Sequence, residues 1–170
     1  MNIKELIENG IGKKLIVDSN LLILLIIGRY DTNLIQYHKK LGKYDIHDFN
    51  FVNFFVQKAK MVYLTPGILS EMSNHLNPSD RNYLKYFNKL LSILGAFYEE
   101  YQKKDIILNL SYFKNLGYTD SSIIDLSANE KCLVLTDDKE MTLELRSKKL
   151  DVINLTDTKH EYFFKRLNLD

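Results

Sequence analysis

The sequence is poor in cysteine, proline and glycine, the residues that form disulfides, linkers and flexible repeats. It has one cysteine, two prolines and seven glycines among its 170 residues. A single cysteine, Cys132, excludes an internal disulfide and fits a reducing compartment, and the apolar run around it predicts a buried, inert thiol. With no linker-like stretch, low-complexity tract or repeat, we expect residues 1–170 to form a single domain.

The chain also lacks an excess of charge of either sign and a long apolar run. Its formal net charge is +1, so nucleic-acid contact would have to come from a local basic patch or from metal ions. The apolar run at residues 21–27 is short, whereas a membrane-spanning helix needs roughly 20 apolar residues. No cleavage site for a secretory signal follows this run. We therefore expect a cytoplasmic protein with no membrane contact.

Four short apolar runs predict β-strands. Each is apolar throughout rather than alternating, which is typical of a parallel sheet covered on both faces. Helical patterns lie between the runs, and such strands are joined by right-handed crossovers. The sequence therefore predicts an α/β protein, a three-layer α/β/α sandwich with a central, mostly parallel sheet of four to five strands. The runs are "KLIVD" ending at Asp18, "MVYLT" ending at Thr65, "CLVLT" ending at Thr136 and "DVINL" ending at Leu155.

Acidic residues recur where these strands end and the next helices begin. Asp18 ends the first strand inside the apolar stretch "LIVDSNLLILLIIG", and Asp137 and Asp138 follow the "CLVLT" strand in the same way. Glu71 falls in the second turn of a predicted helix, and Asp120 opens the helical segment "TDSSIIDLSANEK". Because ligands of open α/β sheets bind at the carboxyl ends of the strands, we expect these acids to gather at one rim.

A rim of carboxylates has a chemical use that single acids do not. Clustered negative charges repel one another, and hard oxygen ligands favour Mg²⁺ or Mn²⁺. Two such ions can activate water and stabilise the leaving oxygen of a phosphodiester. Each acid also has a structural explanation: a turn or cap for Asp18 and Asn20, the helix dipole for Asp120, a contact with His75 for Glu71, and a solvated loop for Asp137 and Asp138. The joint order of the motifs favours the metal site.

In this order the motifs resemble those of the PIN-domain ribonucleases, which include VapC-type toxins and eukaryotic RNA-processing nucleases. The resemblance runs from about Lys14 to Leu155, through "LIVDSNLLI", "LTPGILSEMSNHL", "YTDSSIIDLSANEKCLVLTDDKEM" and "DVINL". It implies an α/β/α sandwich that hydrolyses single-stranded RNA through metal-activated water, with one or two Mg²⁺ or Mn²⁺ ions as cofactor. A narrower expectation is the toxin of a toxin–antitoxin pair, with a small antitoxin protein as partner. A homodimer is a further expectation.

The resemblance gives catalytic and metal-binding roles to four acids, which are Asp18, Glu71, Asp120 and Asp138. Asp137 competes with Asp138 for the fourth place. We expect Asp138 to be the ligand, because the family pattern is T-x-D from Thr136, and Asp137 to cap the helix that follows. Asn20 and Thr136 would orient the ligands, a role that metal sites need. Asp125, a further acid in the third motif, is expected to point to another side of its helix.

The chain departs from compact toxins between the first two acids. The stretch there is longer, and we assign it as a helical insertion around residues 29–60. It carries four candidate RNA-binding residues, Arg29, Lys39, Lys40 and Lys43, among three tyrosines at seven-residue spacing, Tyr30, Tyr37 and Tyr44. Basic residues among aromatics can hold a single strand. The same spacing also predicts a packed tyrosine stripe on a helix with the lysines as its solvated face, and both interpretations stay open.

A second class of function fits the same sequence, namely a non-catalytic PIN-like module that binds RNA or a protein partner. The complete set of acids favours the enzyme, because a degenerate member would be expected to lack a ligand. Saturable Mn²⁺ binding separates the two hypotheses.

Overall fold

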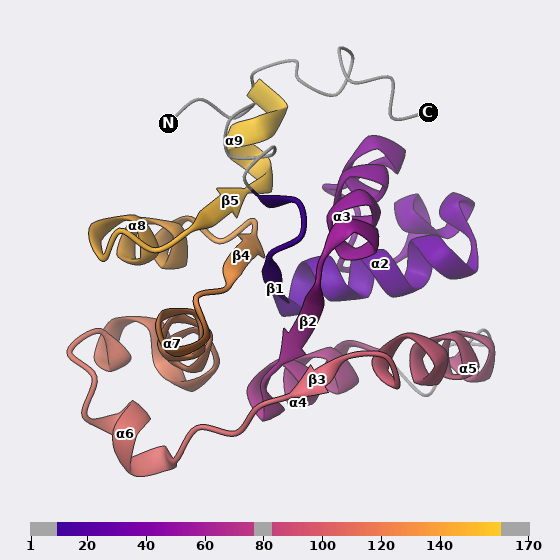
Figure 1. Cartoon of the computed structure of the whole chain (residues 1–170). Helices are drawn as coiled ribbons and strands as arrows, with labels where there is room; N and C mark the ends of the chain where they lie inside the picture. Colours follow the sequence, from indigo (N-terminus) through magenta and orange to yellow (C-terminus); the bar gives the residue numbers. More distant parts are fainter. Residues whose placement is uncertain (1–9, 77–82, 161–170) are drawn as a thin grey trace.

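Five parallel strands form one sheet in the order β3-β2-β1-β4-β5 (Figure 1). They are seen in a computed structural model that describes residues 10–76 and 83–160. Every pairing in the sheet is parallel, so the predicted α/β class and the predicted sheet are confirmed. In chain order the strands are β1 (Lys14–Val17), β2 (Met61–Leu64), β3 (Tyr98–Glu99), β4 (Leu133–Thr136) and β5 (Val152–Asn154).

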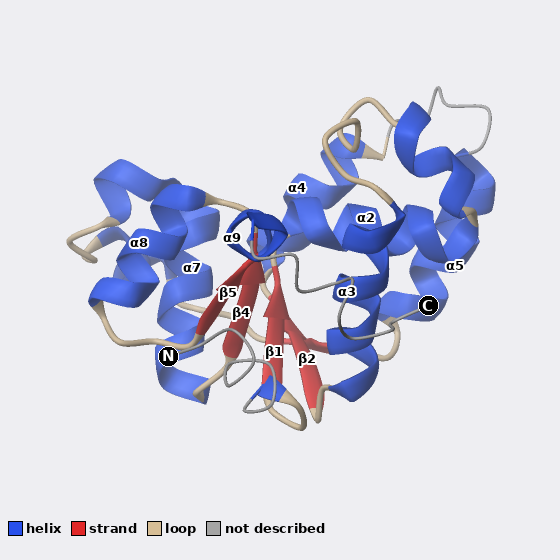
Figure 2. Cartoon of the chain, turned by 90° about the horizontal axis from the view of Figure 1, so that it is seen from above, coloured by secondary structure: helices blue, strands red, loops and turns tan. Residues whose placement is uncertain are grey.

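Helices cover both faces of the sheet and make the three-layer sandwich (Figure 2). On one side of the sheet lie α2 (Ser19–Tyr30), α3 (Ile46–Lys58) and α4 (Pro66–His75), and α5 (Tyr83–Leu94) packs against α2. The other face is covered by α7 (Phe113–Glu130) and α8 (Lys139–Ser147). The shorter elements are the 3-10 helix η1 (Thr32–Tyr37), α6 (Lys104–Leu108) and α9 (Leu155–His160). This arrangement brings the carboxyl ends of all five strands to one edge.

Helix α2 explains why the apolar stretch after Asp18 is so dense. Every residue from Leu21 to Ile27 is fully buried, because α2 packs against α3, α4, α5 and η1 at once. A helix that is surrounded by others is apolar on all sides. Gly28 lets α3 approach closely, since a Cβ there would lie 2.2 Å from the ring of Phe49. The run is therefore the centre of one helical layer.

Strand β3 was not among the predicted strands. It has only two residues, and both of its side chains are exposed at the edge of the sheet. Its pairing partner is β2, where Tyr98 lies beside Tyr63. A strand of this length has neither an apolar run nor an alternation that a sequence pattern can detect.

The segment from 29 to 60 contains the end of α2, then η1 and α3. Its three tyrosines do not share a helix, because the backbone is extended at Asp31 and α2 ends there. Tyr37 is 83% exposed at the end of η1, whereas Tyr44 is buried in the loop before α3. The prediction of a packed tyrosine stripe is therefore wrong.

Two further sequence expectations can be compared with the structure. Cys132 is buried, and burial raises the pKa of its thiol to about 12, as expected for an inert cysteine. Within residues 10–76 and 83–160, none of the helices combines the length and the apolar character needed to cross a bilayer.

Candidate metal-binding site

Asp18 lies at the carboxyl end of β1 and is the N-cap of α2. Its side chain is held from three directions: Thr136 Oγ1 donates to Oδ2 at 2.7 Å, while the Ser19 hydroxyl and the backbone N–H of Asn20 donate to Oδ1. The residue is only 5% exposed. Burial raises the pKa of the carboxyl group from 3.8 to about 6. The hydrogen bond from Thr136 lowers this pKa, and the negative charge of Asp137 raises it. Asp18 is thus a fixed carboxylate that is costly to ionise.

Ser19 connects Asp18 to Glu71 on α4. Its hydroxyl oxygen lies 3.1 Å from Asp18 Oδ1 and 2.8 Å from Glu71 Oε2. A hydroxyl has a single proton to donate. The carboxyl groups of Asp18 and Glu71 therefore compete for this proton or share it in a three-centre hydrogen bond. No sequence pattern indicates a role for Ser19, although Ser19 lies between Asp18 and Asn20, two predicted site residues.

Helix α4 starts as the sequence predicts, with Thr65 accepting from the N–H of Ile68 and Pro66 as first residue. Gly67 then lets it pack tightly against α7. A Cβ at this position would lie 2.9 Å from Thr119 Oγ1 and 3.3 Å from Thr119 Cα. This close approach brings the helix that carries Glu71 next to the residue preceding Asp120.

Asp120 lies in the first turn of the main part of α7. The helix is interrupted at Gly117, whose φ of 78° is outside the helical range, and a regular helix follows. The pKa of Asp120 is raised from 3.8 to about 7, first by burial and then by the negative charges of Asp18, Asp138, Glu71 and Glu140. Acids from four separate segments are therefore close enough to disfavour one another's ionisation.

Thr136 connects the ends of β1 and β4. It donates to Asp18 and accepts from the backbone N–H of Asp138 at 2.9 Å. These are contacts that an orienting residue would make, and the role predicted for Thr136 beside a metal ion stays a prediction. Asn20, predicted to share that role, contributes its backbone N–H, and its side-chain amide forms no hydrogen bond within the described part of the chain.

The structure overturns the capping role predicted for Asp137, while the ligand role of Asp138 stays a prediction. Asp138 is the N-cap of α8, and its Oδ1 accepts from the N–H of Met141 at 2.7 Å. The prediction that Asp137 caps this helix is wrong, because Asp138 immediately precedes the first helical residue and the cap is the side chain that reaches the third one. A second contact holds this turn, since the Asn154 amide donates to the Asp138 carbonyl at 3.2 Å.

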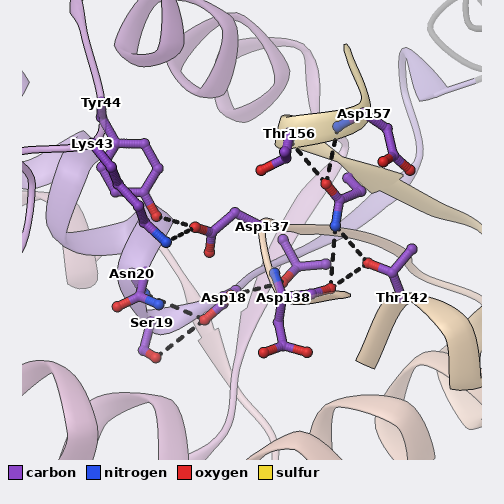
Figure 3. A network of polar contacts seen from close by, with 12 residues as sticks. Asp18, Ser19, Asn20, Lys43, Tyr44, Asp137, Asp138, Thr142, Thr156 and Asp157 are labelled. Carbon is purple, nitrogen blue, oxygen red and sulfur yellow. Dashed lines mark hydrogen bonds and ion pairs between the residues drawn. The ribbon is translucent and has the colours of Figure 1, made fainter. Parts of the chain in front are cut away.

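Asp137 contacts the loop before α3 instead. Its carboxylate accepts a hydrogen bond from the Tyr44 hydroxyl at 2.5 Å and forms an ion pair with Lys43. Figure 3 shows this carboxylate directed towards Lys43 and Tyr44, whereas the side chain of Asp138 points elsewhere. The side chain of Asp137 is 3% exposed. Its charge is therefore already paired within the protein.

The four candidate RNA-binding residues also separate into two groups. Arg29 donates to Asn53 of α3 at 2.8 Å, and partial burial lowers the pKa of its guanidinium. Lys43 is paired with Asp137. Lys39 and Lys40 are exposed and have no ion pair within the described residues. These two lysines are thus the members of the set whose charge faces solvent.

The residues present fit a hard cation in ligand type and in charge. In the part of the chain that the structure describes, none of Asp18, Glu71, Asp120 and Asp138 forms an ion pair. Carboxylate oxygens that lack a positive partner are ligands for Mg²⁺ or Mn²⁺. As the side chains lie, no three acidic, histidine or cysteine groups among residues 10–76 and 83–160 form a set that could hold a metal ion. Binding would require the carboxylates to move closer together.

The sequence matches no protein-family model and no curated protein. Among solved structures, the chain is similar to the crystal structure of PAE2754 from Pyrobaculum aerophilum, at 17% identity and a TM-score of 0.54, covering 94% of this chain and 99% of that one. It is also similar to a domain of a functionally unknown protein from Methanocaldococcus jannaschii DSM 2661, at 19% identity and a TM-score of 0.45, covering 84% and 91% of the two chains. The first likeness shows the fold alone.

Proposed function

We propose that the protein is a metal-dependent endoribonuclease that hydrolyses single-stranded RNA, as the resemblance to PIN-domain ribonucleases implies. The observation that carries the proposal is the position of Asp120. Its pKa of about 7 reflects burial next to Asp18, Asp138 and Glu71, which are acids of three other segments. Such a concentration of negative charge destabilises a protein unless it serves to bind a cation.

The residues of the site have separable roles in this proposal. Asp18, Glu71, Asp120 and Asp138 would hold one or two Mg²⁺ or Mn²⁺ ions. When bound, such ions supply activation of water and stabilisation of the leaving oxygen of a phosphodiester. Ser19 holds Glu71 at a set position relative to Asp18. Thr136 holds Asp18 and the start of α8 together. No side chain needs to act as a nucleophile.

A non-catalytic module that binds RNA or protein is the second candidate. The observation in its favour is that no three potential ligands in the described ranges form a metal-binding set. The two candidates differ in their behaviour with Mn²⁺. Saturable binding that is abolished in Asp18→Asn supports the enzyme, and no binding at millimolar Mn²⁺ supports the module. The antitoxin partner, the homodimer and the cytoplasmic location stay predictions from sequence.

Cleavage of a labelled single-stranded RNA by the purified chain tests the enzyme directly. We expect cleavage with Mn²⁺ or Mg²⁺ and none after addition of EDTA. Asp18→Asn, Glu71→Gln and Asp120→Asn should each lower the rate by at least about a hundredfold, the scale of losing one electrostatic contributor. A matched control is Asp125→Asn, which changes an acid of the same helix that pairs with Asn129. Full activity in any of the three variants would remove that residue from the site.

A further inference from the structure

The loop from residue 38 to 45 contacts the site although it lies far from it in sequence. Leu41 and Tyr44 are buried, and the N–H of Tyr44 donates to the Leu41 carbonyl at 2.8 Å. Lys39, Lys40 and Lys43 are exposed. The loop is therefore a compact turn with two buried attachment points and its basic side chains outside.

The loop is attached to the site through the buried carboxylate of Asp137. This carboxylate receives the Tyr44 hydroxyl and the Lys43 ammonium, both from residues more than 90 positions away in the chain (Figure 3). Both contacts fall on Oδ2, and together they compensate the charge of the carboxylate. A buried carboxylate that is already paired with a cation attracts a metal ion less strongly than an unpaired one.

The loop also lies close to helix α4. The pKa of His75 is lowered by burial and by the positive charge of Lys40, and it is raised by the charge of Glu71. Lys40 therefore lies near His75, which is one turn along α4 from Glu71. Lys43 lies on Asp137, the neighbour of the proposed ligand Asp138. Because Lys39 and Lys40 are within four residues of Lys43, the anchored loop carries its basic side chains near the site.

We infer that Asp137 is an anchor and not a metal ligand: with Tyr44 and Lys43 it fixes the basic loop beside the site. Lys39 and Lys40 then hold backbone phosphates of the single strand whose cleavage is the proposed function, on which this inference rests. Tyr44 and Asp137 are positioning residues that act on the substrate through the loop. Backbone phosphate contacts of this kind do not depend on base sequence.

Steady-state cleavage and binding of a mixed-sequence single-stranded RNA test the anchor. Tyr44→Phe and Asp137→Asn should each raise KM by roughly tenfold, the scale of one hydrogen bond to a charged group, with kcat and Mn²⁺ affinity retained. The double variant should have a KM no higher than that of Asp137→Asn alone, because both changes act on the hydrogen bond between Tyr44 and Asp137 and only Asp137→Asn also affects the ion pair with Lys43. Tyr37→Phe is the matched control, since it removes the hydroxyl of an exposed tyrosine of the preceding 3-10 helix.

The lysines have a separate readout. For RNA binding in EDTA, Lys39→Met/Lys40→Met should lower the slope of log affinity against log salt by about 0.7 for each lost phosphate contact. The control pair Lys58→Met/Lys60→Met removes two exposed lysines before β2, at the opposite end of the sheet. An equal loss of slope in the control pair would overturn the assignment of the lysines.

The outcomes distinguish this inference from the proposed function. An active wild type with unchanged KM in both anchor variants overturns the anchor alone. Loss of Mn²⁺ binding in Asp137→Asn also overturns it, because Asp137 would then be a ligand. A wild type that neither binds nor cleaves single-stranded RNA overturns the proposed substrate, and the role of the loop with it.

Discussion

Neighbouring residues of the site differ in whether their charge is already compensated. Asp137 has a lysine and a tyrosine on its carboxylate, while Asp138 has one oxygen on the N–H of Met141 and no cation within the described residues. An N-cap carboxylate keeps its second oxygen for another partner. Capping and metal binding by Asp138 are therefore compatible, and the cap sets the direction of the side chain.

Replacing each of these two acids by asparagine separates their roles. Asp138→Asn keeps the cap, since Asn caps about as well as Asp, so the free energy of unfolding should change by less than about 0.5 kcal/mol. Its Mn²⁺ affinity should fall by more than about tenfold, because even changes behind metal ligands cost 10- to 100-fold. Asp137→Asn should keep the Mn²⁺ affinity of the wild type. Isothermal titration calorimetry with Mn²⁺ measures the affinity of both variants. The opposite order of affinities would make Asp137 the ligand in place of Asp138.

The site residues that the sequence could indicate are those with a local signature. Asp18 and Thr136 end apolar runs, and Glu71 follows a capped helix start, so each position can be read from its immediate neighbours. The contact between Tyr44 and Asp137 joins positions that are 93 residues apart. No local pattern encodes such a contact, and for this reason the anchor appears only in the structure.

Among the elements, α4 and α7 set the spacing between two of the proposed ligands. Glu71 and Asp120 come from these helices, which touch where Gly67 meets Thr119. The sequence indicates both helices but not this contact, because a glycine within a helix signals either weakness or close packing. The periodicity of apolar residues thus predicts which helices exist, and the side chains at the contact between two helices decide how closely these helices approach.

Gly67→Ala tests the importance of this spacing. The new methyl group would lie 2.9 Å from Thr119 Oγ1 and 3.3 Å from Thr119 Cα, so we expect α4 and α7 to separate and Glu71 to move with α4. Alanine also favours the helix by about 1 kcal/mol over glycine, which offsets part of the strain. We therefore expect a small change in melting temperature but a clear loss of Mn²⁺ affinity and cleavage rate.

Two further variants control for helix propensity and for the contact itself. Ser70→Ala raises the helix propensity at an exposed position of α4, and it should leave Mn²⁺ affinity unchanged. Thr119→Ala removes the oxygen nearest to the new methyl group, and in the Gly67→Ala background it should restore part of the affinity. Wild-type affinity in Gly67→Ala would show that the spacing of the two helices does not matter for the site.

For the molecule as a whole, the buried acids make stability depend on pH. The pKa values of Asp18 and Asp120 are about 6 and about 7 in the folded protein, above their ordinary value of 3.8. Between 3.8 and these values the folded chain holds protons that the unfolded chain has released. The resulting contribution to stability is fully present below pH 3.8 and is lost as the pH rises through 6 and 7.

The metal-free protein should therefore melt at a lower temperature at about pH 8 than at about pH 5, and Asp120→Asn should show a smaller difference. Asp120→Asn should also melt higher than the wild type at the upper pH, since one buried negative charge is gone.

Mn²⁺ should raise the wild-type melting temperature by mass action, more at the upper pH because protons compete for the same oxygens. Asp120→Asn should gain less from Mn²⁺, while Asp125→Asn should behave like the wild type. Scanning calorimetry with and without Mn²⁺ measures all of these shifts. Equal gains from Mn²⁺ in the wild type and in Asp120→Asn would contradict a metal site at Asp120, and a pH-independent melting temperature would contradict the charge repulsion on which the site is argued.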